Sequence, residues 1–124
     1  MSNLIGLTVR TRRVNARTAV VTLEGEMDIF TTPRARATML RLLDDGCHDL
    51  IVDLRQAAYL DSTALGALLG MLRRARERGG GVRLLAPSHS VYRLLEITRL
   101  TLAFPIDATE HDALAAVGGR QGDA

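Results

Sequence analysis

The run Leu50-Ile51-Val52-Asp53-Leu54 is the sequence feature that most constrains the fold. Its side chains are almost continuously apolar, and runs of this kind are typical of a central strand that is covered on both faces. In α/β domains, helices packed on a largely parallel sheet provide that cover. The run therefore predicts a buried strand in a sheet that helices enclose.

Other strands are predicted before and after this run. Residues 7–14 partly alternate between apolar and polar side chains, and residues 18–23 are rich in β-branched side chains, so together they predict an opening hairpin. Residues 82–86 predict a fourth strand. Residues 102–106 predict a short fifth strand, which Pro105 places toward the edge of the sheet because proline has no N–H to donate.

Helices are predicted between these strands and after the last of them. The first starts at Thr31 or Thr32 and stops at Gly46, and the second opens at Asp61-Ser62 and stops at the three glycines 79–81. A third helix follows Pro87-Ser88. A fourth begins after Thr109, in a segment that resembles a capping box.

The order of these elements predicts an α/β fold with one domain. Residues 1–117 should form a mixed four- to five-stranded sheet packed by about four helices, with its middle strands parallel. The polar residues 118–124 predict a disordered C-terminal tail.

Length and composition limit the classes of function. A chain of 124 residues suits one hydrophobic core, and its single cysteine, Cys47, excludes an intramolecular disulfide. No charged and then apolar leader opens the sequence, and the longest apolar stretch, residues 63–73, is too short to span a bilayer. We therefore expect a cytoplasmic protein that does not insert into a membrane.

The charged residues and the histidines do not indicate a nucleic-acid or metal site. The net charge is +2, and all sixteen basic residues are arginines. Two groups of them, within residues 10–17 and 73–78, are compatible with a nucleic-acid surface. We favour solvated faces because aromatic residues make up only 3% of the chain and acidic residues are interspersed. The three histidines lack metal-ligand spacing. We expect no metal, no cofactor and no direct nucleic-acid partner.

The segment Asp61-Ser62-Thr63 has two interpretations. Aspartate and serine are both preferred at the start of a helix, where their oxygens accept hydrogen bonds from unpaired backbone N–H groups. Alternatively, Ser62 accepts a phosphate, whose negative charge the helix N-terminus would stabilise and Asp61 would repel. A phosphate there would change the surface with little damage to the fold.

Five ordered segments carry a resemblance to a known family. They are Leu23-Glu24-Gly25-Glu26-Met27-Asp28, Ile51-Val52-Asp53-Leu54, Tyr59-Leu60-Asp61-Ser62-Thr63-Ala64-Leu65-Gly66, Gly79-Gly80-Gly81-Val82-Arg83-Leu84 and Val91-Tyr92-Arg93-Leu94-Leu95. This pattern resembles the STAS domain, and in particular the bacterial anti-sigma-factor antagonists. The resemblance runs from about Leu7 to Val117, which is almost the whole chain.

The resemblance implies a regulator of transcription that is not an enzyme. Proteins of this family bind an anti-sigma factor, often one with a serine kinase fold, and thereby free a sigma factor for RNA polymerase. The kinase phosphorylates the serine that follows the motif's aspartate, which abolishes binding, and a serine phosphatase resets the switch.

The family's site can be carried over residue by residue. Ser62 is then the phosphorylation site, Asp61 is its acidic neighbour, and Asp28 matches the acid of the upstream motif. The partner-binding surface is expected to comprise Asp28, Asp61, Ser62, Thr63, Ala64 and Leu65. Many members of the family have glycine at the position of Ala64.

Two other functions fit the same residues. One is an accessory STAS subunit of a membrane transport or signalling complex, in which no phosphorylation occurs. The other is a small enzyme with Ser62 as its nucleophile, although the sequence shows no convincing base beside it.

Overall fold

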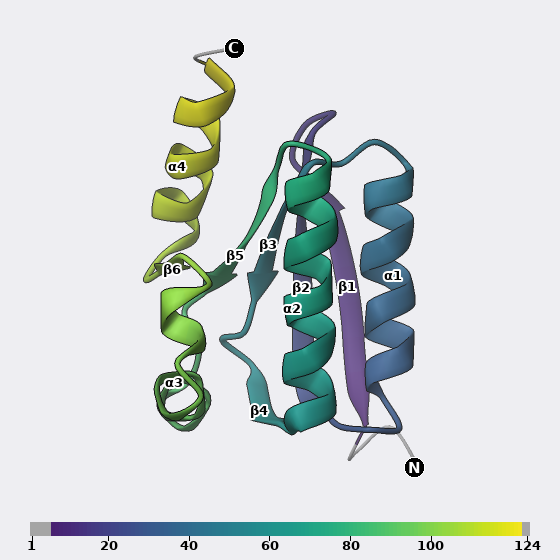
Figure 1. The fold of residues 1–124 in the computed structure, drawn as a ribbon, viewed down its shortest axis with the longest axis vertical. Helices are drawn as coiled ribbons and strands as arrows, with labels where there is room; N and C mark the ends of the chain where they lie inside the picture. Colours follow the sequence, from purple (N-terminus) through teal and green to yellow (C-terminus); the bar gives the residue numbers. More distant parts are fainter. Residues whose placement is uncertain (1–5, 123–124) are drawn as a thin grey trace.

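The computed structural model describes residues 6–122, which form one mixed sheet with helices packed on it (Figure 1). This arrangement confirms the predicted α/β fold. The elements in chain order are β1 (Leu7–Arg13), β2 (Thr18–Met27), α1 (Thr32–Asp44), β3 (Asp49–Asp53), β4 (Ala57–Leu60), α2 (Ser62–Glu77), β5 (Gly81–Leu85), α3 (His89–Ile97), the 3-10 turn η2 (Leu100–Leu102), β6 (Ile106–Asp107) and α4 (Glu110–Gly122).

The sheet has the order β1-β2-β3-β5-β6, with β4 paired to β2 outside this path. Strands β1 and β2 form the predicted antiparallel hairpin, and the other pairings are parallel. All five residues of β3 are buried. Their side chains alternate between the two faces of the sheet, so a central strand of this kind must be apolar on both sides.

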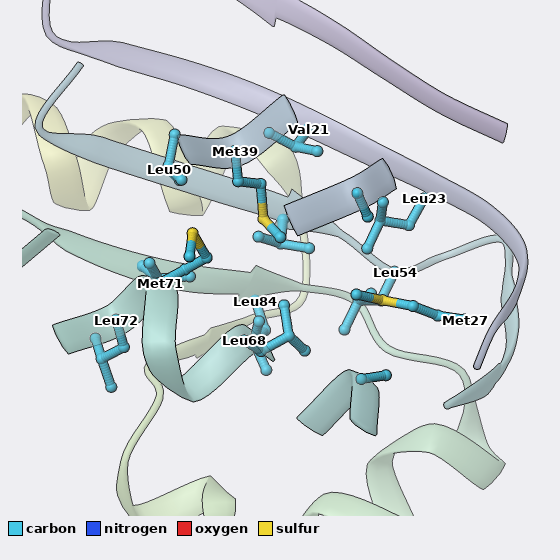
Figure 2. Packing of buried hydrophobic residues seen from close by; sticks show 14 of the residues in the cluster. Val21, Leu23, Met27, Met39, Leu50, Leu54, Leu68, Met71, Leu72 and Leu84 are labelled. Atoms are coloured by element: carbon cyan, nitrogen blue, oxygen red, sulfur yellow. The ribbon is translucent and has the colours of Figure 1, made fainter. Parts of the chain in front are cut away.

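The two faces of β3 contact different helices. Leu50 and Val52 belong to the main core, which includes the buried apolar residues of α1, α2 and α3. Ile51 belongs to a second, smaller cluster with Ala113 and Val117 of α4. Figure 1 shows α1 and α2 side by side across the sheet, and Figure 2 shows the main core beneath them. This core holds the start of both helices in place.

The structure contains a strand, β4, where the sequence predicted a loop. Strand β2 continues to Met27, past the point where its pairing with β3 ends, and β4 pairs with this extension. Within β4 only the first and last residues, Ala57 and Leu60, are buried. The segment therefore lacks the alternation from which a strand is predicted, and its pairing depends on a distant part of the chain.

Two further differences lie near the C-terminus. In place of one strand over residues 102–106, the chain forms η2 and then the two-residue strand β6, which begins directly after Pro105. Helix α4 runs on to Gly122, so residues 118–122 are helical where the sequence predicted a disordered tail. Glycine in a helix lowers its stability without preventing it. Residues 123 and 124 lie outside the described residues.

Gly80 is required for the close approach of the α2–β5 turn to the start of β3. A Cβ atom added at Gly80 would lie 1.7 Å from the backbone oxygen of His48, so the backbone would have to move. We expect Gly80→Ala to lower the free energy of unfolding by about 1–3 kcal/mol. Gly70→Ala is the control, because a Cβ there meets nothing within 4 Å, and equal stability of the two variants in urea unfolding would contradict this prediction.

Candidate functional site

The site lies where β2 and β4 end beside each other. Met27 and Leu60, the last residues of these parallel strands, are register partners and are both buried. The N–H of Asp61 donates to the backbone oxygen of Met27 at 3.2 Å. The loop that follows β2 therefore lies against the first turn of α2.

Asp61 is the N-cap of α2. One of its carboxylate oxygens, Oδ1, accepts a hydrogen bond from the backbone N–H of Ala64 at 3.0 Å. The other oxygen, Oδ2, accepts from the backbone N–H of Ile29 at 3.1 Å. A single carboxylate thus caps the helix and fixes the loop that connects β2 to α1.

Asp28 organises the same loop from within. Its Oδ1 accepts hydrogen bonds from the N–H groups of Phe30 at 2.8 Å and Thr31 at 3.0 Å. The Thr31 N–H is the largest cause of a lowered pKa for Asp28, with desolvation opposing it and the Phe30 N–H adding to it. Because the folded-state pKa is the lower one, ionised Asp28 stabilises the loop at neutral pH. This stabilisation is lost as the pH falls through the lowered pKa.

Ser62 is the first residue of α2 and is exposed to solvent. Among the described residues, none forms a hydrogen bond with its hydroxyl group. The two interpretations of Asp61-Ser62 therefore apply to different residues. Asp61 caps the helix, and the Ser62 hydroxyl is left free. The positive end of the helix dipole at this point favours an added negative charge.

Large apolar side chains are exposed around this serine. Phe30 is 88% exposed, Ile29 is 60% exposed and Tyr59 is 50% exposed. Ile29 and Phe30 lie in the loop that Asp28 and Asp61 hold, and Tyr59 of β4 is the register partner of Glu26. Exposed aromatic side chains on an ordered loop are typical of protein contact sites.

These three residues were not among the predicted site residues. The available signal was the pair of large apolar residues between Asp28 and Thr31, where a loop is normally polar.

The other predicted site residues occupy two different environments. Thr63 is exposed beside Ser62, whereas Ala64 and Leu65 are buried in the main core. Their side chains therefore hold α2 against the sheet and are not presented to a partner. The methyl group that distinguishes Ala64 from glycine packs in the core.

The remaining candidate features provide no second site. Within residues 6–122, no group of three or more His, Cys, Asp or Glu side chains is placed to hold a metal ion. Several arginines of the two basic groups are ion-paired, including Arg10 with Glu24, Arg12 with Glu110 and Arg78 with Asp44. No helix in the described part of the chain is long and apolar enough to cross a membrane.

The different contacts of Asp61 and Ser62 predict different effects on stability. Asp61→Ala removes the helix cap and the contact with Ile29, so we expect the free energy of unfolding to fall by about 1–2 kcal/mol. Ser62→Ala removes no protein hydrogen bond and should change it by less than about 0.5 kcal/mol. Thermal or urea unfolding measures both, and a Ser62→Ala loss as large as that of Asp61→Ala would contradict this assignment of the cap.

Comparison with known families gives a match over most of the chain. The model of the STAS domain family matches residues 10–113. The anti-sigma-B factor antagonist of Staphylococcus aureus is 34% identical over 80 residues, which cover 64% of this chain and 74% of that protein.

Solved structures give the same result. The anti-sigma factor antagonist SpoIIAA in its unphosphorylated form is 26% identical, with a TM-score of 0.81 over 90% of this chain and 97% of that one. An anti-sigma factor antagonist from Mycobacterium paratuberculosis is also 26% identical, with a TM-score of 0.78 over 90% of this chain and 94% of that one.

Proposed function

Because the chain belongs to the STAS domain family, we propose that it is a cytoplasmic anti-sigma-factor antagonist whose binding is controlled by phosphorylation of Ser62. Its partner is an anti-sigma factor with a serine kinase fold, and binding frees a sigma factor for RNA polymerase. A serine phosphatase reverses the modification. The protein acts by binding and catalyses no reaction. The names of its relatives support the antagonist role.

The free Ser62 hydroxyl is the observation that carries the phosphorylation step. A kinase needs a hydroxyl that is exposed and not engaged in the fold, and Ser62 meets both conditions at the first position of α2. Since Asp61 caps the helix, the phosphate can be added without loss of the cap. The relative SpoIIAA has been solved in its unphosphorylated form, which is consistent with this kind of control in that protein.

The charges around Ser62 explain why a phosphate would oppose binding. The phosphate adds a charge of about −1.5 to −2 beside Asp61, and Asp28 orders the neighbouring loop. In the free protein, solvent surrounds this charge and the helix dipole partly offsets it. In a complex the same charge would have to be desolvated beside Asp61, which raises the free energy of the bound state.

The proposed partner-binding surface consists of the polar residues around Ser62 and the exposed apolar residues beside them. Asp28, Asp61, Ser62 and Thr63 form the polar part, and Ile29, Phe30 and Tyr59 form the apolar part. Ala64 and Leu65 support the surface from the core. Aromatic side chains surrounded by polar groups are the usual composition of an energetic centre in a protein interface.

Partner capture tests the proposed function. The unphosphorylated protein is immobilised, exposed to a lysate of its own cells, and the retained proteins are identified by mass spectrometry. We expect an anti-sigma factor with a serine kinase fold on wild-type protein and its loss on Ser62→Asp. Retention of membrane-transport subunits by both baits, without an anti-sigma factor, would contradict the proposal and favour an accessory STAS subunit.

A further inference from the structure

The two helices that begin beside the site enclose a groove on the outer surface. The α1–α2 groove has a volume of about 470 Å³, and the residues that line it include Thr32, Pro33, Arg36, Thr63, Gly66 and Ala67. Figure 1 shows that both helices begin at the same end of the molecule, the end where β4 lies. The groove includes Thr63, the residue that directly follows Ser62.

Gly66 leaves open space in this groove, and the packing of the fold does not require a glycine at this position. It lies in the interior of α2, where glycine is less stable than alanine because it loses more conformational freedom. A Cβ added at Gly66 would meet nothing within 4 Å. No close approach of another part of the described chain therefore explains the glycine.

The groove also contains a charged side chain, Arg36. Arg36 is exposed and forms no ion pair within residues 6–122. Its guanidinium group favours an incoming carboxylate.

We propose that the α1–α2 groove binds a segment of the anti-sigma factor that carries apolar side chains and a carboxylate. The apolar side chains would cover Pro33, Gly66 and Ala67, and the carboxylate would pair with Arg36. The inference rests on the proposed function and adds a second contact region to the surface around Ser62.

The position of the groove links this contact to the phosphorylation site. Thr63 lines the groove and directly follows Ser62 in the first turn of α2. A phosphate on Ser62 would therefore add negative charge next to a residue of the groove, which disfavours an incoming carboxylate. Arg36 is not part of the surface around Ser62, and binding of a carboxylate in the groove would give its positive charge a function.

Two substitutions test the groove with matched controls on the same helices. Gly66→Leu fills the open space and Arg36→Glu reverses the charge that would hold the carboxylate. Gly70→Leu is the control on α2, because a Cβ there also meets nothing within 4 Å and Gly70 does not line the groove. Arg41→Glu is the control on α1, because Arg41 is exposed and also lies outside the groove.

The measurement is the dissociation constant for the purified anti-sigma factor that the unphosphorylated protein retains from its own cells. We expect both groove variants to bind at least about tenfold more weakly, and both controls to bind within about twofold of wild type. Gly66→Leu should have a melting temperature no lower than wild type, so a binding loss would not reflect unfolding.

The outcomes separate the groove from the proposed function. Wild-type affinity of the groove variants, or an equal loss in the controls, would overturn the groove proposal. If Ser62→Asp still abolishes binding in that case, the proposed function stands without the groove. If the wild-type protein retains no anti-sigma factor, both proposals fall.

Discussion

Replacing Ser62 with aspartate should weaken binding of the anti-sigma factor by about 30-fold or more. An unpaired charge placed in an interface costs about 2–5 kcal/mol, and Ser62 lies beside Asp61, so the added carboxylate meets a like charge. The substituted side chain is exposed in the free protein and forms no part of the core. Titration calorimetry with the purified partner measures the change.

Two controls isolate the effect of the charge. Ser62→Asn has nearly the same shape as Ser62→Asp but carries no charge, and it should retain affinity within about fivefold of wild type. Ser90→Asp introduces the same charge in the first turn of α3 at another exposed serine and should leave binding unchanged. Wild-type affinity of Ser62→Asp would argue against the charge mechanism.

Phe30→Ala should cause the second large loss of affinity, about 2–4 kcal/mol, or about 30- to 1000-fold. The side chain is 88% exposed in the free protein, and the loop that carries it is held by Asp28 and Asp61. An exposed aromatic ring on a loop that hydrogen bonds already hold contributes a large contact area, and little of the loop's conformational entropy remains to be lost on binding. The same titration with the purified partner measures this loss.

The Phe30→Ala prediction has two controls: the stability of the variant itself, and the affinity of a variant at a distant exposed apolar residue. An exposed ring contributes little to folding, so Phe30→Ala should change the free energy of unfolding by less than about 0.5 kcal/mol. Leu102→Ala removes a side chain that is 82% exposed on η2, outside the proposed surface, and should not affect binding. Equal affinity of Phe30→Ala and wild type would remove Phe30 from the interface.

The sequence was sufficient to predict the helices and strands that have a clear hydrophobic pattern within their own residues. The apolar run 50–54 identified the central strand, and the periodic segments with their caps identified α1 and α2. Strand β4 was not predictable because its pairing depends on how far β2 extends beyond β3. Strand β6 is two residues long, which is too short for an apolar pattern to indicate its bounds.

The sequence indicated which of the candidate residues lie near one another better than it indicated which of them are exposed. Asp28 and Asp61 lie together, as the family resemblance implied, because β2 and β4 end side by side. Which of Asp61 and Ser62 caps the helix depends on a one-residue difference in where α2 begins, and only the structure resolves it. The exposure of Phe30 depends on the loop geometry, which hydrophobic patterning cannot indicate because apolar residues are normally assigned to the core.

Phosphate mapping tests the central claim most directly. The protein is incubated with its partner kinase and ATP, and the modified residue is identified by mass spectrometry in wild type and in Ser62→Ala. We predict one phosphate on Ser62 in wild type and none on Ser62→Ala, whose fold is intact because the Ser62 hydroxyl supports no part of it. Phosphate on another residue, with Ser62→Ala modified as fully as wild type, would contradict the assignment of Ser62 as the switch.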